Sequence, residues 1–486
     1  MRQRKSSKYI IILLCLLGHN AYAQNVTEQA IEKLLSQSVY KHTNVSIAAF
    51  DIETEKQIVD IRSDKMLVPA SSMKIITTLV AIDRLGSDFR FNTEISYDGI
   101  IGPDGTLKGN LYIVGSGDPT LGSKRMEGNP NMDEVLRIIR DAIIDYGITC
   151  IEGDIVADES VFDSFPISPS WQWNDLGNYY AGGSWGLNIK DNEYYIYLHK
   201  RGKVGTRPAV KFFSPHIPKL DLSNEITVDS SNTGDNAYIF GGPYNYYKRL
   251  TGTIPAGEGT FTIKGSIPDP PLFLAYHVRE QLEKANIQSQ SYTSTFKKNR
   301  KKRTSIHMLQ SPALQDIVKL TNMKSINLYA ESILKTIAGK AKMRASGGAG
   351  IAVIKKALKK QGVPITGLHM EDGSGLSARN AVSSKVFAST VMAYSNKMGV
   401  EKVCSLLPRG GREGTVVNMF KGSGMEGKVW LKSGSMDRVF SYTGILKNKE
   451  GRWTSFSVII NGFSQKHRTM RPKLEQIIKK IYLHKS

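Results

Sequence analysis

The chain has 486 residues, of which 40% are hydrophobic and 22% are charged, and it carries a formal net charge of +21. A chain of this length, with 44 glycines, is typical of a folded, turn-rich protein and exceeds what one ordinary hydrophobic core can hold, so two or three domains are predicted. The nine histidines are scattered without the spacing of metal ligands, so a metal site is disfavoured and no cofactor is expected.

The first 23 residues have the organisation of a secretory signal peptide. Basic residues open the segment, Tyr9 to Leu17 form an apolar run, and Ala21-Tyr22-Ala23 provides small residues for cleavage after Ala23. The run is shorter than the ~20 apolar residues of a membrane-spanning helix, and a retained signal anchor is the alternative interpretation. We therefore expect export to the periplasm.

In an exported protein, the excess of lysine and arginine favours anionic partners other than nucleic acid. A wall polymer or a lipid headgroup surface fits this charge, so peripheral contact with the wall or the membrane is one interpretation. A merely solvated basic surface is the other. The sequence does not determine the oligomeric state.

Cys150 and Cys404 are the thiols that remain after cleavage. An oxidising compartment would allow them to pair, but their separation in sequence is no evidence that they do. Two buried free thiols are the interpretation that we favour.

Predicted strands gather at the two ends of the chain, and each group lies next to a terminal helix. Alternating apolar residues indicate strands at 44–51, 57–62, 428–432, 440–446 and 454–461. Helical periodicity places the flanking helices at 28–37 and 470–482. The predicted fold class is therefore α/β (α+β), with a five-stranded antiparallel sheet built from both termini and flanked by helices.

The middle of the chain is expected to be inserted into this sheet. From about residue 90 to 300 it is rich in Gly, Pro, Asn and Tyr, with short alternating runs that indicate a β-rich insertion in two parts. The predicted boundaries are 24–88 and 305–486 for the main domain, 89–165 and 265–304 for inserted domain II, and 166–264 for inserted domain III. The basic run 297–303 is interpreted as a solvated linker that leads back to the main domain.

A helix is expected over 73–82, ending at Gly86, and Ser71 and Lys74 stand at its start. Their spacing of three places the lysine amine on the same helix face as the serine hydroxyl. A hydroxyl needs a neighbouring base to become a good nucleophile. Lysine can serve if burial and a nearby positive charge, here that of Lys432, lower its pKa. Taken alone, the pattern also fits a simple helix cap.

Ser325 and Asn327 lie between two further helical stretches, at 313–321 and 328–337. An ordinary cap between helices is the simplest interpretation. In an acyl-transfer site, however, Ser325 would pass a proton towards the leaving amine. Asn327 would then hydrogen-bond both Lys74 and an amide of the substrate.

Lys432, Ser433 and Gly434 end a predicted strand. An edge strand can bind an extended acyl chain through its main chain, and glycine allows the close approach. Lys432 and the Ser433 hydroxyl would hold a terminal carboxylate. The backbone N–H groups of Ser435 and Ser71 would form an oxyanion hole. A turn at the end of a strand is the simpler interpretation of this motif alone.

A second serine motif, Gly182-Gly183-Ser184-Trp185-Gly186, matches the pattern of the α/β-hydrolase nucleophile elbow. That elbow must follow a buried strand and open a helix. Here no such strand precedes the motif, and a strand-like alternation follows it. We therefore do not expect Ser184 to be a nucleophile.

In this order, the three motifs are those of penicillin-binding proteins and class A β-lactamases. With further segments at 115–121, 153–158, 269–273 and 371–377, the chain resembles the low-molecular-mass class C penicillin-binding proteins over nearly all of its mature length. These form a family of D-alanyl-D-alanine carboxypeptidases and endopeptidases. The resemblance implies a transpeptidase/β-lactamase-like domain with a two-part insertion. It also implies peptidoglycan stem peptides as substrate and acylation by β-lactam antibiotics.

Two positions depart from the pattern of that family. Ser433 stands where threonine is usual, so a hydroxyl remains, and Ile326 stands where Asp or Asn is frequent, so its side chain is expected to point away. The resemblance further implies that Arg379 and Asp158 contact the free amino and carboxyl groups of the stem peptide.

We therefore predict a serine DD-peptidase in which Ser71, deprotonated by Lys74, forms an acyl-enzyme with a D-alanyl carbonyl. Removal of terminal D-alanine and cleavage of peptide cross-links both remain open. A serine β-lactamase is the first alternative, although such an enzyme has no need of the large insertion. A non-catalytic protein that binds the cell wall is the second, although a decayed site has no physical need for the intact set of residues.

Overall fold

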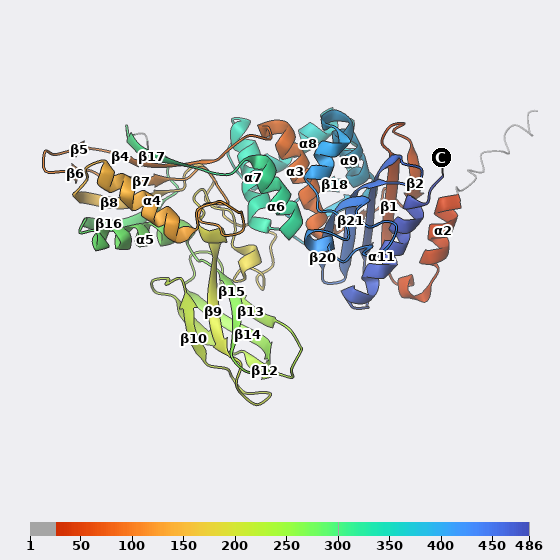
Figure 1. The fold of residues 1–486 in the computed structure, drawn as a ribbon, viewed down its shortest axis with the longest axis horizontal. Helices are drawn as coiled ribbons and strands as arrows, with labels where there is room; N and C mark the ends of the chain where they lie inside the picture. Colours follow the sequence, from red (N-terminus) through yellow and green to blue (C-terminus); the bar gives the residue numbers. More distant parts are fainter. Residues whose placement is uncertain (1–25, 300, 486) are drawn as a thin grey trace, which may run out of the picture.

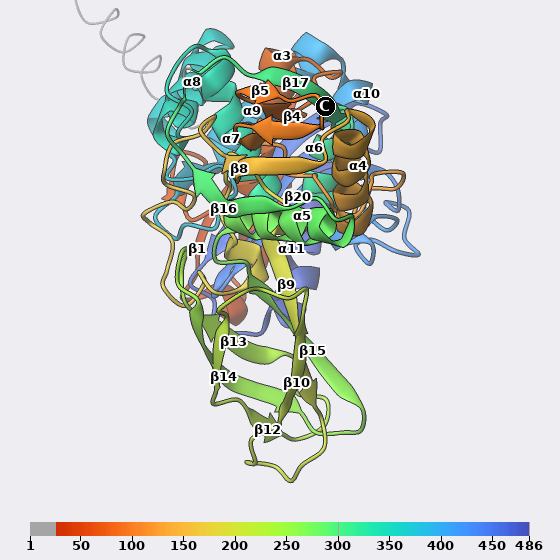
Figure 2. The ribbon, with the colours of Figure 1, turned by 90° about the vertical axis from the view of Figure 1, so that its left-hand side faces the viewer.

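The computed structural model describes residues 26–299 and 301–485, and the predicted signal peptide lies outside the described residues. The chain begins in one domain, leaves it for two inserted lobes and returns to it (Figure 1). The second lobe projects from the rest of the molecule as a β-rich arm (Figure 2). Within the described ranges, no helix combines the length and the apolar character needed to cross a bilayer.

The main domain is built on a five-stranded antiparallel sheet, which confirms the predicted fold class. Its strands, in spatial order, are β2 (Gln57–Ile61), β1 (Asn44–Asp51), β22 (Trp453–Asn461), β21 (Val439–Lys447) and β20 (Val429–Met436). β1 pairs with β22 along its whole length, from Asn44 opposite Asn461 to Asp51 opposite Thr454. The two ends of the chain are therefore joined inside one sheet.

Helices cover both faces of this sheet (Figure 1). α2 (Val26–Leu35) and α11 (His467–Tyr482) pack on one face, where α11 buries apolar residues at three- and four-residue spacing. The other face carries α3 (Lys74–Leu85), α6 (Leu314–Lys324), α7 (Asn327–Lys340), α8 (Gly347–Lys360), α9 (Ser384–Met398) and α10 (Val400–Ser405). A small sheet of β18 (Leu368–His369), β19 (Ala381–Ser383) and β3 (Met66–Leu67) lies beside them. α7 is buried from Leu328 to Ala338 and forms the centre of this layer.

The first lobe contains a seven-stranded sheet. The main path runs through β17 (Thr304–Gln310), β4 (Asn92–Tyr97), β7 (Leu111–Val114), β8 (Cys150–Asp158), β6 (Thr106–Lys108) and β5 (Ile100–Ile101), and β16 (Ser289–Thr295) also pairs with β8. α4 (Met132–Asp145) and α5 (Pro270–Lys284) contribute buried residues to the same core.

The second lobe consists of two small sheets that share this core. One contains β10 (Val210–Ser214), β9 (Glu193–His199) and β15 (Thr260–Ser266). The other contains β11 (Asp221–Asn224), β14 (Tyr247–Pro255), β12 (Thr227–Asp229) and β13 (Asn236–Phe240).

The chain re-enters the main domain later than the predicted boundary at residue 305. β17 pairs antiparallel with β4, so 304–310 belongs to the sheet of the first lobe. The basic run before it is also more than a solvated linker, because Arg303 is ion-paired with Asp158 at 2.7 Å and lies over the ring of Tyr112. Pairing between strands so far apart in the chain leaves no local signal in the sequence, which explains the difference.

Cys150 and Cys404, the cysteines of the described residues, are free thiols. Cys150 is half-buried on β8, and Cys404 is buried on α10. Burial raises the pKa of Cys404 to about 12, so this thiol is protonated and unreactive at neutral pH.

Candidate active site

Ser71 lies on a short 3-10 turn that runs directly into α3. The turn spans Ala70–Met73, and Ala70 adopts the left-handed conformation at φ 47° just before the serine. Gly375 packs against the Ala70 carbonyl, where no side chain would fit. The next helical turn brings Lys74 to the same side, and its Nζ donates a hydrogen bond to Ser71 Oγ at 3.0 Å. Local structure thus places the base beside the nucleophile.

The amine of Lys74 is buried and held by several acceptors. It also donates to Asn327 Oδ1 and to the backbone oxygen of Ser374, both at 2.6 Å. Burial lowers the pKa of Lys74 to about 7, while the charges of Asp372 and Glu331 oppose this shift by favouring the ammonium form. A large fraction of the amine is therefore neutral near pH 7 and able to accept a proton.

The charge of Lys432 was expected to lower the pKa of Lys74, and the structure differs on this point. The shift at Lys74 comes from burial. Lys432 is itself buried, and burial together with the charge of Lys74 lowers the pKa of Lys432 well below its usual value. Its Nζ donates to Ser325 Oγ at 3.0 Å and to the backbone oxygen of Ser433 at 2.5 Å. Lys432 therefore links the second and third motifs.

The second motif joins α6 to α7. Ser325 ends α6 in the left-handed conformation at φ 58°, and Asn327 begins α7. Asn327 Nδ2 donates to the backbone oxygen of Tyr180 at 2.9 Å, which brings the insertion into contact with the site. Ile326 is buried in the apolar core of the helical layer. The side chain is therefore packed inward, in agreement with the expectation that it points away from the site.

The third motif lies on β20, directly beside the turn that carries Ser71. A Cβ added to Gly434 would lie 2.5 Å from the backbone oxygen of Pro69 and 2.8 Å from the nitrogen of Ser72. Only glycine permits this contact between strand and turn. The hydroxyls of Ser433 and Thr415 share a hydrogen bond of 2.7 Å.

These elements surround a cavity of about 350 Å³. Its lining residues are Ser71, Ser325, Thr415, Ser433, Ser435, Phe440, Tyr442, His467 and Arg471. Lys74 and Lys432 stand behind this lining and hydrogen-bond Ser71 and Ser325, respectively. Asn327 accepts from Lys74, and Gly434 lies in β20 between the lining residues Ser433 and Ser435. The structure thus brings all three motifs, from opposite ends of the sequence, to one cavity.

Three other candidate residues lie elsewhere. Asp158 is not among the lining residues of this cavity; it is 3% exposed, and its carboxylate is ion-paired with Arg303. Arg379 is 70% exposed and lies 3.5 Å from Glu371 rather than in the cavity lining. Ser184 is buried in an irregular segment between two 3-10 turns, without a preceding strand, so no nucleophile elbow is formed.

Two charged residues of the site, Glu331 and Arg471, lie outside the sequence motifs. Glu331 Oε1 accepts hydrogen bonds from the backbone N–H of Ser374 at 2.7 Å and of Gly373 at 3.0 Å, and Ser374 in turn accepts from Lys74. Glu331 lies four residues after Asn327 on the same helix, and this spacing is a sequence signal that could have revealed it. Arg471 reaches the cavity from α11 and has no such local signal.

Comparison with known proteins gives one family. The D-alanyl-D-alanine carboxypeptidase DacB of Haemophilus influenzae is 26% identical over 461 residues, covering 92% of each chain. The D-alanyl-D-alanine carboxypeptidase of an Actinomadura species is 24% identical over 450 residues, covering 89% of this chain and 80% of the relative. The crystal structure of penicillin binding protein 4 from H. influenzae has a TM-score of 0.81 at 24% identity, covering 93% of this chain and 99% of that one. The family model described as D-Ala-D-Ala carboxypeptidase 3 (S13) matches residues 27–481, and the chain therefore belongs to this family.

Proposed function

We propose that the protein is a serine DD-peptidase that acts on peptidoglycan stem peptides through an acyl-enzyme at Ser71. Membership of the S13 family supports a serine peptidase of this class, and the relatives named above are D-alanyl-D-alanine carboxypeptidases. The observation that carries the proposal is the convergence of the three motifs on one cavity of about 350 Å³.

Acylation follows from the hydrogen bonds of the site. The neutral amine of Lys74 takes the proton of Ser71 Oγ across 3.0 Å while the hydroxyl oxygen attacks the D-alanyl carbonyl carbon. The backbone N–H groups of Ser71 and Ser435 stabilise the resulting oxyanion. The proton that Lys74 accepted then passes to the leaving amine through Ser325, whose hydroxyl is oriented by Lys432, and Lys74 is neutral again. Water then attacks the ester, with Lys74 again as the base.

Recognition of the substrate is assigned to the outer part of the cavity. The hydroxyls of Ser433 and Thr415, together with the Arg471 guanidinium, offer donors of the kind that bind a terminal carboxylate. β20 provides main-chain groups along which an extended peptide can pair. A β-lactam presents the same electrophile next to a carboxylate, so we propose that it acylates Ser71 as well.

The place of action is a further part of the proposal. The leader at 1–23 supports export to the periplasm with cleavage after Ala23. The charge of +21 supports peripheral contact with anionic wall polymer.

The proposal is tested with purified mature protein, starting at Gln24, and its Ser71→Ala variant. Fluorescent penicillin should label the wild type stoichiometrically and leave the variant unlabelled. Muropeptides incubated with the wild type should lose terminal D-alanine, or cross-linked dimers should separate, as measured by mass spectrometry. Rapid turnover of penicillin without peptide cleavage would show a β-lactamase instead, and equal cleavage by the variant would exclude Ser71 as the nucleophile.

A further inference from the structure

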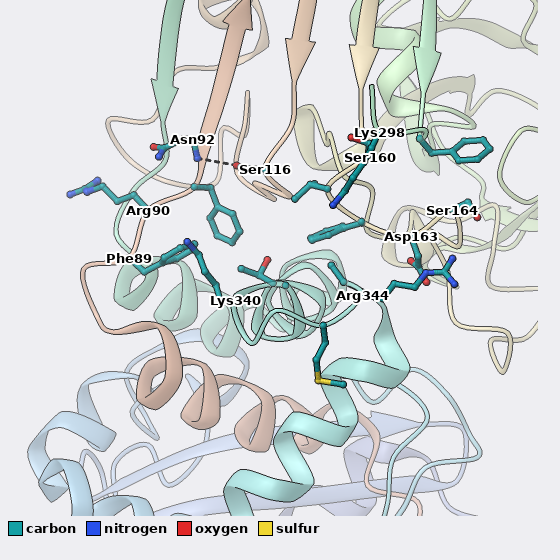
Figure 3. A pocket seen from close by; sticks show the side chains of 18 residues that line it. Phe89, Arg90, Asn92, Ser116, Ser160, Asp163, Ser164, Lys298, Lys340 and Arg344 are labelled. Carbon is teal, nitrogen blue, oxygen red and sulfur yellow. Dashed lines mark hydrogen bonds between the residues drawn. The ribbon is translucent and has the colours of Figure 1, made fainter. Parts of the chain in front are cut away.

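A second cavity, of about 640 Å³ and larger than the catalytic one, lies where the first lobe joins the main domain. It stands at the opposite end of α7 from Asn327, and its lining contains no residue of the three motifs. One wall is the last turn of α7 with the residues just after it, and the facing wall consists of the loops after β8 and β16 (Figure 3). The segment 89–92, through which the chain enters the lobe, closes one side.

The cavity has an aromatic and apolar lining that is partly open to solvent. Phe91 and Phe162 are buried beneath it, Phe89 is half-buried, and Phe296 on the insertion side is 50% exposed. Met343, on the opposite side, is 44% exposed. Exposed large apolar side chains such as these two, beside a cavity with an aromatic floor, commonly mark a binding surface. Hydrocarbon faces, such as those of sugar rings and small alkyl side chains, fit this lining.

The rim of the same cavity is positively charged. Its cationic residues are Arg90, Lys298, Lys340 and Arg344. Figure 3 shows Lys298 reaching into the space from the insertion and Lys340 reaching into it from α7. The Nζ of Lys340 lies 5.1 Å from the centre of the Phe89 ring, so charge and aromatic surface are adjacent.

The acidic residue of the lining, Asp163, does not cancel this charge. It is ion-paired with the buried Lys335 at 3.1 Å. Lys335 also donates to the backbone oxygens of Phe165 at 2.7 Å and Ser184 at 3.1 Å. These bonds fasten the loop after β8 to α7. The walls are therefore positioned before any ligand arrives, as in most small-ligand sites, and the rim keeps its positive charge.

We propose, on the basis of the proposed function, that this cavity is a non-catalytic binding site for an acidic muropeptide segment of peptidoglycan. Stem peptides carry free carboxylates beside small apolar side chains, and the attached sugars present hydrocarbon faces. The cavity offers a partner for each of these features, with cations at its rim and aromatic rings in its lining.

The site is too far from Ser71 for one short peptide to occupy both cavities. α7 runs from Asn327, which contacts Lys74, to Lys340 at the second cavity, and 14 residues at a rise of 1.5 Å make this about 20 Å. A peptide of about five residues spans at most about 17 Å when fully extended. Simultaneous occupation therefore requires the polymer, so the second cavity holds peptidoglycan while Ser71 acts on a neighbouring peptide.

The inference is tested by removing the charge of the rim and measuring retention on the polymer. The junction variant carries Lys298→Gln, Lys340→Gln and Arg344→Gln, and its binding to purified sacculi is measured by cosedimentation at about 0.15 M salt, where long-range attraction is screened. Ser71→Ala is added to every protein in this assay so that the sacculi are not digested. Binding is expected to fall about tenfold, because several charge-assisted contacts are lost together.

A matched control removes the same number of charges from exposed positions away from the cavity. It carries Arg201→Gln in the second lobe with Lys356→Gln and Lys359→Gln on α8. This control should keep its binding to sacculi. Equal losses in the two triple variants would overturn the inference in favour of a diffuse basic surface, and unchanged binding of the junction variant would also overturn it. A loss confined to phosphatidylglycerol vesicles would assign the cavity to lipid and overturn it likewise.

Activity on a short substrate separates this inference from the proposed function. With Ser71 present, both triple variants should hydrolyse a short D-Ala-D-Ala peptide at the wild-type rate, because that peptide does not reach the second cavity. If the proposed function is wrong, the wild type itself will be inactive on this peptide. Binding to sacculi requires no turnover, so it tests the second cavity independently. If the junction variant shows no thermal unfolding transition, the single variant Lys298→Gln, in an exposed loop, replaces it. Its binding to sacculi is expected to fall about threefold. Unchanged binding of that variant would overturn the inference.

Discussion

Replacing Gly434 by alanine is expected to slow acylation of Ser71 by about a hundredfold without unfolding the protein. Gly434 lies where β20 passes the turn that carries the serine. An added Cβ would lie 2.5 Å from the Pro69 oxygen and 2.8 Å from the Ser72 nitrogen, with the Ser441 hydroxyl closer still. Ordinary contacts of a Cβ begin near 3.4 Å, so strand and turn must move apart by most of an ångström.

This separation acts directly on the oxyanion hole. One proposed donor, the N–H of Ser435, lies on β20, and the other, the N–H of Ser71, lies on the turn. A misplacement of about 1 Å can cost about a hundredfold in rate, and loss of one oxyanion donor costs about a hundred- to a thousandfold. The overpacking itself costs about 1–3 kcal/mol, which is less than the typical stability of about 5–15 kcal/mol.

The assay is the second-order rate of acylation by a fluorescent penicillin, measured beside thermal unfolding. Gly424→Ala is the matched control, because an added Cβ there meets nothing within 4 Å. It should acylate like the wild type. A Gly434→Ala variant that also acylates at the wild-type rate would refute the reasoning, because it would show that the strand can retreat without disturbing the reacting groups.

Three further predictions concern other parts of the molecule. Below about pH 7 the acylation rate should fall about tenfold per pH unit, because burial lowers the pKa of Lys74 to about 7 and protonation removes the base. A flat pH profile in this range would contradict the role of Lys74 as the base. Lys335→Met should lower the midpoint of thermal unfolding, because the substitution leaves the Asp163 carboxylate without its buried partner, at a cost of about 3–5 kcal/mol. An unchanged midpoint would show that this ion pair does not stabilise the fold. Arg471→Gln should raise KM about tenfold for peptides with a free terminal carboxylate and leave amidated peptides unaffected, and equal effects on both in a kinetic comparison would exclude the contact.

The sequence predicted the family and the class of activity, and the match to the S13 family confirms both. It also predicted the sheet strand by strand, since the range 44–51 coincides with β1 and the other four strands lie within a few residues of their expected bounds. These strands are recognisable because they are short runs rich in apolar residues, as expected for β1, β21 and β22, which are buried at nearly every position between two layers of helices. In the same way, the spacing of Ser71 and Lys74 fixes their contact within one helical turn.

Contacts between segments distant in the chain could not be predicted from local sequence patterns. The resemblance to a family suggested Asp158 as a substrate contact, but in the fold Arg303 occupies its carboxylate. Arg471 lines the catalytic cavity only because α11 packs on one face of the sheet.

The sequence by itself therefore determined the chemistry of the site and the sheet that carries it, because both are encoded in residues that are neighbours along the chain. Only the tertiary structure decided which charges remain available to a ligand, where the insertion ends and that a second, basic cavity lies at the junction of the lobes. Each of these depends on how segments hundreds of residues apart pack together, and side-chain burial and pairing at such contacts leave no periodic pattern in the sequence.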